Sequence, residues 1–102
     1  MIDEIHKKFA AGEFEFSRHA VDQSILRHIS VYEVREAMAV GEVIEDYPDD
    51  KYGPSCLVLG ITQARRSLHI QCSHPAARPV LKIVTLYEPD ANLWIDSKVR
   101  RT

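Results

Sequence analysis

The sequence predicts an α+β domain in which three N-terminal helices pack on one face of an antiparallel sheet of about four strands. Helical periodicity fills most of residues 2–40, whereas alternating or continuously apolar runs fill most of residues 42–88. Short polar turns separate these later runs, and helices followed by closely linked strands are typical of the α+β class. The 102 residues contain no repeat or linker-like tract, so we expect one domain spanning residues 1–102.

Residues 2–11 and 31–40 combine helical periodicity with end signals. Before the later segment, Ser30 can cap a helix and Glu33 stands three residues on, which together make a capping box. Gly41 follows the last helical residue, at a position where a left-handed conformation favours glycine. We therefore expect a helix in each segment.

The helix expected over residues 18–28, behind a Ser17 cap, carries a polar ridge. The members of the ridge recur four residues apart and so share one side of a helix. They are His19, Gln23 and Arg27. Val21 and Ile25 lie roughly opposite, and the ridge is expected to be either a solvated surface or a binding surface.

Four later segments have strand patterns. They are residues 42–47, 55–62, 67–73 and 80–88. The last is the most apolar and is expected to be the central strand, whereas residues 13–16 are expected to be a short extended link. In the segment 42–47, strict alternation puts Val43, Glu45 and Tyr47 on one side of the strand and Glu42 on the other. The expected core includes Val34, Met38, Leu57, Leu59, Leu68, Ile70, Val84 and Leu86.

Composition excludes some classes of protein. The net charge of −2 argues against a surface built for tight phosphate binding, so a nucleic-acid role must rest on a local basic patch. There is no leader pattern, and no apolar run approaches the roughly 18 residues that a membrane span needs. We therefore expect a cytoplasmic protein without membrane contact, in which Cys56 and Cys72 are free, buried thiols.

A metal site is not predicted, although His69, Cys72 and His74 follow one another at ligand-like spacing. Strand alternation puts Cys72 and His74 on one face and His69 on the other, so the three cannot easily share an ion. The chain also lacks a glycine-rich phosphate loop. We expect no metal and no cofactor.

A polar face on the sheet is the strongest chemical signal. Gln71 follows His69 by two residues and Tyr87 follows Thr85 by two, so the two pairs can be neighbours if they share a face. Histidine titrates near neutrality, and tyrosine can stack on a base or donate a proton. The alternative is that His69 and Tyr87 form an amphipathic pair packing at a sheet edge.

Several segments in order resemble one known family. They are FSRHA, GEVIEDYPDD, SLHI and IVTLYEPD, within residues 16–90. The sequence resembles the small bacterial family called domain of unknown function 4258, which is similar to the compact toxin folds related to RelE-type messenger-RNA interferases. Members are often encoded beside a small zinc-finger antitoxin. His19 and Arg27 match the family pattern, whereas the family usually has arginine where Gln23 stands and glycine where His28 stands.

This resemblance, together with the polar face, implies a toxin-like, metal-independent endoribonuclease that acts on messenger RNA, in solution or at the ribosome. His69 would be the general acid or base, and Tyr87 would stack on a base or assist proton transfer. Arg27 would clamp the scissile phosphate, with His19 orienting it. The other residues expected to bind substrate are Gln71, Thr85, Arg100 and Arg101. The expected protein partner is a small antitoxin of the zinc-finger type.

The alternative function is a non-catalytic binding module that holds a small protein partner through its sheet face or an edge strand. Lys98, Arg100 and Arg101 follow Trp94, which gives a basic end to a slightly acidic protein. We expect these basic residues to bind an acidic partner segment or RNA, and we expect their charges to affect the rate of association with it more than the rate of dissociation. A frayed, solvated terminus is the competing interpretation.

Overall fold

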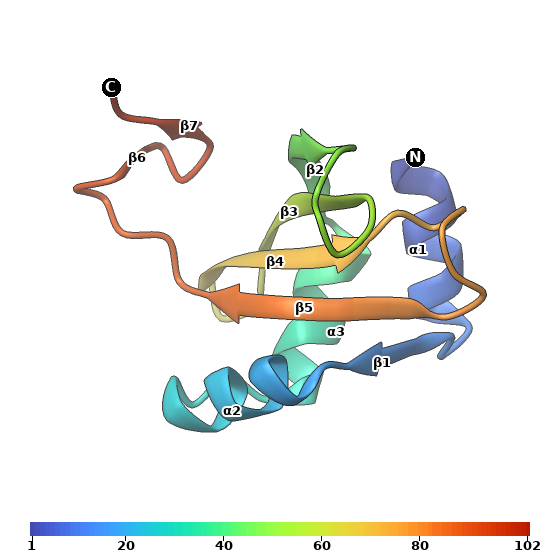
Figure 1. The fold of residues 1–102 in the computed structure, drawn as a ribbon. Coiled ribbons are helices and arrows are strands. Elements are labelled where there is room, and N and C mark those ends of the chain that lie inside the picture. Colours follow the sequence, from blue (N-terminus) through green and yellow to red (C-terminus); the bar gives the residue numbers. More distant parts are fainter.

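The computed structural model describes residues 1–102, which form three helices and seven strands (Figure 1). In chain order these are α1 (Ile2–Ala10), β1 (Phe14–Phe16), α2 (Arg18–Leu26), α3 (Val31–Ala39), β2 (Glu42–Tyr47), β3 (Ser55–Ile61), β4 (Ser67–Ser73), β5 (Leu81–Tyr87), β6 (Trp94–Ile95) and β7 (Val99–Arg100). The α+β class and the three N-terminal helices are confirmed. None of the helices has the length and apolar character needed to cross a membrane.

The main sheet has five strands in the order β1-β5-β4-β3-β2, and it is mixed rather than antiparallel. The expectation of about four antiparallel strands was wrong because residues 13–16 do not simply link two helices. Phe14 to Phe16 form an edge strand that pairs in parallel with β5 from Leu81 to Ile83. With β1 outside it, β5 is the second strand of the sheet, and β4 rather than β5 is central.

The core lies between the sheet and α1 and α3, which pass behind the strands in Figure 1. Alternation along β3, β4 and β5 supplies the sheet side of this core. Its largest fully buried members are Ile5, Val34, Met38, Val58, Leu68, Ile70, Leu81, Ile83 and Leu86.

Three residues expected in this core lie elsewhere. Leu57 and Leu59 are buried, but their cross-strand partners are Gln71 and His69, so they point to the face away from the helices. Val84 is the extra residue where the pairing of β4 with β5 shifts register, and it is only partly buried. The sheet therefore has apolar side chains on both faces.

The helix ends follow the sequence signals closely. Ser30 and Glu33 form the reciprocal capping box, and the Ser17 hydroxyl accepts a hydrogen bond from the backbone N–H of Ala20. Gly41, however, is not left-handed. A Cβ there would lie 2.5 Å from Val58 Cγ1, so close packing rather than backbone conformation requires glycine.

Arg66 fastens the turn between α2 and α3. Its guanidinium donates to the carbonyl oxygens of Arg27 (2.9 Å) and His28 (2.8 Å) and forms ion pairs with Glu33 and Glu88. These bonds satisfy carbonyls that the end of α2 leaves free. His28 has a φ of 53°, in the left-handed region that favours glycine.

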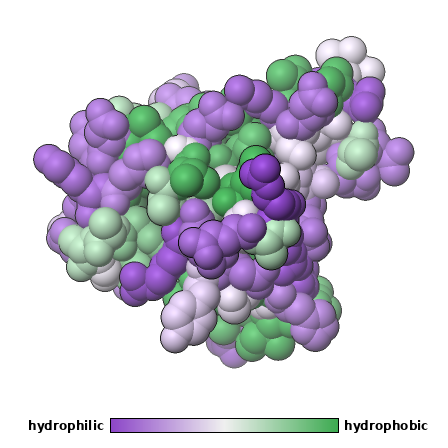
Figure 2. Space-filling view, turned by 180° about the vertical axis from the view of Figure 1, so that it is seen from behind, coloured by the Kyte–Doolittle hydropathy of each residue, from purple (hydrophilic) through white to green (hydrophobic).

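Helix α2 lies beside the outer edge of β5. Strand β1 pairs with the first half of that edge, up to Ile83, and α2 follows β1 along the rest of it. The Ser17 hydroxyl donates to the Val84 carbonyl (2.9 Å), and Ala20 is the only fully buried residue of the helix. The helix therefore covers an edge that would otherwise expose unpaired backbone groups. Its aliphatic residues are exposed, and green side chains appear at the lower edge of the view from behind, where α2 lies (Figure 2).

Candidate functional site

The open face, meaning the face of the sheet away from α1 and α3, holds the four polar residues singled out by the sequence. His69 pairs across the strands with Tyr87, and Gln71 pairs with Thr85. The prediction that these residues share one face is therefore confirmed. Because the four positions are directly opposed in pairs, their side chains can interact across β4 and β5.

His69 is completely buried, because the hairpin of β6 and β7 lies over it. Its Nε2 is 2.5 Å from the Ser97 carbonyl oxygen, its Nδ1 is 3.3 Å from the Tyr87 hydroxyl, and the Trp94 ring meets it edge-on at 4.5 Å between centroids. A carbonyl only accepts, so Nε2 carries the proton and Nδ1 accepts from Tyr87. Burial lowers the pKa of His69, which favours this neutral form.

Glu45 and Arg100 form a second part of the same cluster. Arg100 Nε donates to both carboxylate oxygens of Glu45 (3.1 and 2.9 Å), and the Tyr47 hydroxyl donates to Glu45 Oε1 (2.5 Å). Burial raises the pKa of Glu45, but the hydrogen bonds from Arg100 and Tyr47 outweigh it and hold the pKa below its usual range. Burial and the bond to Glu45 raise the pKa of Tyr47 to about 12.

The position of Glu45 depends on a β-bulge. Pairing between β2 and β3 shifts register between Val43 and Glu45, so Glu42 lies opposite Leu59 and Glu45 lies opposite Leu57. Both acids therefore lie on the open face, although strict alternation separates them. The sequence prediction placed Glu42 and Glu45 on opposite sides, and it was wrong for this reason.

The basic end of the chain is folded onto these two acids. Lys98 forms an ion pair with Glu42 (3.1 Å), Arg100 pairs with Glu45, and Arg101 Nε donates to the Ala91 carbonyl (2.9 Å). Arg100 also lies over the Trp94 ring, 4.6 Å from its centroid. In this conformation the basic residues hold the hairpin on the sheet, so they are not the free, solvated end considered as one interpretation of the sequence.

Three other residues predicted for the site, Arg27, Gln71 and His19, make no hydrogen bond to this cluster. Burial raises the pKa of Tyr87, and the positive charges of Arg100 and Arg27 only partly offset this rise. Arg27 itself is exposed and its Nε donates to Gln23 Oε1 (2.6 Å). Gln71 belongs to another network, because it donates to Ser55 Oγ (3.0 Å) and Asp50 Oδ2 (3.4 Å). His19 lies exposed in the first turn of α2 and makes no hydrogen bond. The structure thus joins His69, Tyr87 and Arg100, and leaves His19 apart.

Sequence reasoning missed several members of the cluster. They are Glu45, Tyr47, Trp94 and Ser97. The alternation in β2 did place Glu45 and Tyr47 on one side, which was a usable signal. Nothing local connects that strand with the C-terminal segment, because the ion pair joins residues 55 positions apart.

One comparison with known proteins gave a match. The family model described as "Domain of unknown function (DUF4258)" matches residues 16–88. This chain belongs to the DUF4258 family. Neither the curated proteins nor the solved structures contain a significant match to it. The DUF4258 match includes Glu45, His69 and Tyr87 but stops before the hairpin, so Trp94 and Arg100 lie outside the matched region.

The two cysteines of this DUF4258 protein face the helices. Cys56 and Cys72 are directly opposed on β3 and β4, with their sulfur atoms 3.9 Å apart, and both are free and buried as predicted. His69 is on the other face of the same strand, in agreement with the alternation argument. No group of three or more His, Cys, Asp or Glu side chains is arranged to hold a metal ion.

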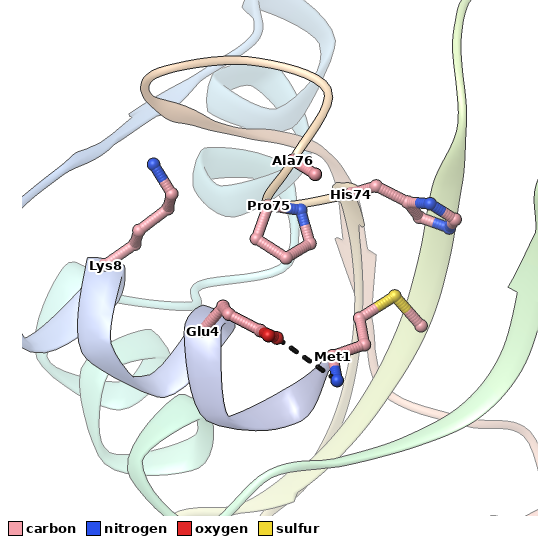
Figure 3. Close-up of a pocket in the computed structure, with 6 residues that line it drawn as sticks. All are labelled: Met1, Glu4, Lys8, His74, Pro75 and Ala76. Atoms are coloured by element: carbon pink, nitrogen blue, oxygen red, sulfur yellow. Dashed lines mark ion pairs between the residues drawn. The ribbon is translucent and has the colours of Figure 1, made fainter.

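A separate pocket of about 380 Å³ lies at the start of α1 (Figure 3). Its lining residues are Met1, Glu4, Lys8, His74, Pro75 and Ala76. The Met1 amine pairs with Glu4 (3.1 Å), and the ring of His74 bonds to Asp46 (2.5 Å). None of the residues in the His69 cluster reaches this pocket, so we treat the two as independent.

Burial of neutral His69 predicts a specific loss of stability in mild acid. Its folded pKa is lowered, so as the pH falls below about 6.5 the unfolded chain takes up a proton first and unfolding becomes easier. For this one group, the free energy of unfolding falls by at most about 1.4 kcal/mol for each unit by which the pH is lowered. Urea unfolding of the wild type and His69→Gln at pH 7.5 and 5.5 measures it. We expect the wild type to lose more unfolding free energy between pH 7.5 and pH 5.5 than His69→Gln does. Equal losses in the two proteins would contradict a buried neutral His69.

Proposed function

We propose that this DUF4258 protein is a metal-independent endoribonuclease, the toxin of a bacterial toxin–antitoxin pair, which cleaves messenger RNA. The observation that carries the proposal is the cluster of Glu45, His69, Tyr87 and Arg100 on one face of the sheet. It combines a carboxylate, an imidazole, a phenol and a guanidinium, which are groups suited to moving protons and holding a phosphate.

Cleavage through the RNA's own 2′-hydroxyl needs only such groups. Glu45 would take the proton from the 2′-oxygen, which attacks the phosphorus as the bond to the 5′-oxygen breaks. Once the covering hairpin has lifted and water reaches it, His69 would take up a second proton from solvent and give a proton to that leaving oxygen, while Glu45 returns its proton to water. Arg100 would stabilise the charge on the phosphate oxygens. The products are a 2′,3′-cyclic phosphate and a free 5′-hydroxyl, and no metal takes part.

The proposed reaction requires the hairpin to move. His69 has no exposed surface, and Arg100 is held by the same carboxylate that would act as base. The hairpin contains only two residues in each strand, and its two ion pairs to the sheet are largely exposed at Lys98 and Arg100. Exposed ion pairs contribute little stability, so we expect the hairpin to open far more readily than the sheet.

The resemblance to RelE-type interferases supports the same reaction class, as an analogy of fold rather than of measured activity. It also suggests the partner, a small antitoxin of the zinc-finger type. Among the residues proposed from sequence, Arg27 remains a candidate phosphate contact on the family resemblance, and its exposed side chain is bonded to Gln23 of the same helix (2.6 Å). Gln71, Thr85 and Arg101 are proposed to line the path of the RNA, whereas His19 is exposed on α2 and has no hydrogen bond to any member of the cluster.

Cleavage of RNA in EDTA tests the proposal. The purified chain is incubated with a single-stranded RNA and with the same strand carrying 2′-deoxy sugars, with and without ribosomes. We expect cleavage of the RNA alone, with cyclic phosphate ends. Activity that requires added metal, or cleavage of the deoxy strand, would refute the mechanism.

The complete burial of His69 favours a second candidate, a non-catalytic module that binds a small protein. Expression of the chain by itself in bacterial cells separates the two. A ribonuclease toxin arrests growth, whereas a pure binding module leaves growth unchanged. Absence of both growth arrest and RNA cleavage would make the binding module the better description.

A further inference from the structure

Helix α2 and the start of α3 expose an unusual amount of apolar surface. The exposed fractions are 41% for Val21, 69% for Ile25, 70% for Leu26, 49% for Val31 and 79% for Tyr32. We call these five residues the α2 patch. Single exposed apolar residues are ordinary, but this stretch of twelve positions holds five large ones, four aliphatic and one aromatic, and such a concentration is typical of surfaces that bind a partner.

The fold does not need apolar residues at these positions. Helix α2 covers the edge of β5 with its other side, where Ala20 is buried and Gln23 and Ser24 are half-buried. A helix with a polar outer side would cover that edge equally well. The exposed aliphatic side chains on the outer side are therefore open to contact with a partner.

The charge around the patch indicates which kind of partner fits. Residues 17–32 contain Arg18, Arg27 and Asp22 as their charged residues, a net charge of +1, whereas the whole chain has −2. Arg18 and Arg27 are exposed at the two ends of the helix. An apolar surface flanked by arginines is complementary to apolar residues flanked by carboxylates.

The backbone around α2 excludes one mode of binding. The outer edge of β5 is already occupied by β1 and, beyond Ile83, by α2 itself. Helix α2 and strand β1 therefore stand where a partner strand would have to lie in order to extend the sheet at this edge. A partner helix needs only side-chain contacts, which α2 offers along its outer side.

We propose that the α2 patch binds an amphipathic, acidic helix of a protein partner. Its apolar residues would pack on Ile25 and Leu26, and its carboxylates would pair with Arg18 and Arg27. The apolar residues of the patch lie outside the His69 cluster, so this proposal stands whether or not the chain cleaves RNA; Arg27 is the one residue that it shares with the proposed phosphate contacts. Four of the five patch residues are aliphatic and only Tyr32 is aromatic, which favours protein over RNA as the ligand, because single-stranded RNA is held mainly by aromatic and basic groups.

Two synthetic helical peptides with identical leucine positions provide the test, one with glutamates flanking the leucines and one with lysines. Fluorescence anisotropy measures their binding to the full chain at low and high salt. We expect the acidic peptide to bind at least about tenfold more tightly, and we expect salt to reduce the difference. Ile25→Ser with Leu26→Ser should abolish this binding, with an unchanged circular dichroism spectrum because both side chains are exposed.

Val40→Ser is the matched control, because Val40 is an equally exposed aliphatic residue (66%) at the other end of α3. It should leave peptide binding unchanged. Equal affinity for the two peptides, or binding that survives the double substitution, would overturn the proposal. So would self-association of the chain that the double substitution removes, since the patch would then bind a second copy. Loss of RNA binding in the double variant would show a nucleic-acid surface instead.

Discussion

Replacing Glu45 with glutamine is expected to slow RNA cleavage about 10²–10⁴-fold, the usual scale for the loss of a general base. The amide has nearly the shape of the carboxylate but cannot take up the proton of the 2′-hydroxyl. In wild type the carboxylate is available at neutral pH, since hydrogen bonds from Arg100 and Tyr47 keep its pKa low. Single-turnover cleavage in EDTA measures the effect.

Glu42→Gln controls for the hairpin, because Glu42 binds Lys98 of the same hairpin but lies outside the His69 cluster. It should cleave RNA at close to the wild-type rate. His69→Ala is expected to lose activity by a factor similar to that of Glu45→Gln, since both would transfer protons. Full activity of Glu45→Gln would remove the carboxylate from the mechanism, and equal losses in Glu42→Gln and Glu45→Gln would assign the effect to the hairpin.

Replacing Gly60 with alanine is expected to have the largest effect on stability. A Cβ at this position would lie 2.1 Å from the Ala37 carbonyl oxygen and 2.8 Å from its Cα. These are backbone atoms of α3, so no change of rotamer relieves the overlap, and the helix must move off the sheet. Overpacking typically costs about 1–3 kcal/mol, and we expect a loss above that range. Urea unfolding followed by circular dichroism measures it.

Gly41→Ala is the matched comparison. Its Cβ would first meet a methyl group of Val58 at 2.5 Å, and a side-chain methyl can shift more easily than helix backbone. We expect a smaller loss than for Gly60→Ala. The opposite order, or a Gly60→Ala variant as stable as wild type, would mean that α3 is not packed this closely on β3.

The hairpin of β6 and β7 connects the catalytic proposal with control of activity. It buries His69 and contributes Arg100, so one segment both blocks the cluster and completes it. This segment lies outside the part of the chain that matches the DUF4258 family. The matched region therefore contains the acid and base proposed here, whereas the cover over them belongs to the part that follows.

Local physical chemistry determined most of the elements of this protein. The capping box at Ser30 and the Ser17 cap act within three residues, so the sequence alone located the starts of α2 and α3. The two-residue period of a strand likewise placed His69 with Gln71 and Thr85 with Tyr87, whereas the register of β4 with β5 decided that the two pairs share a face. These predictions succeeded because their causes lie within a few residues of one another.

The tertiary structure decided what depends on distant segments. Residues 14–16 became a strand because β5 offered its free edge, and the side of α2 that faces inward followed from that placement. This is why Ile25 is exposed although its spacing resembles that of a core residue. The bulge in β2 and the return of the hairpin brought Glu45 and Arg100 to His69, across separations that no local pattern encodes.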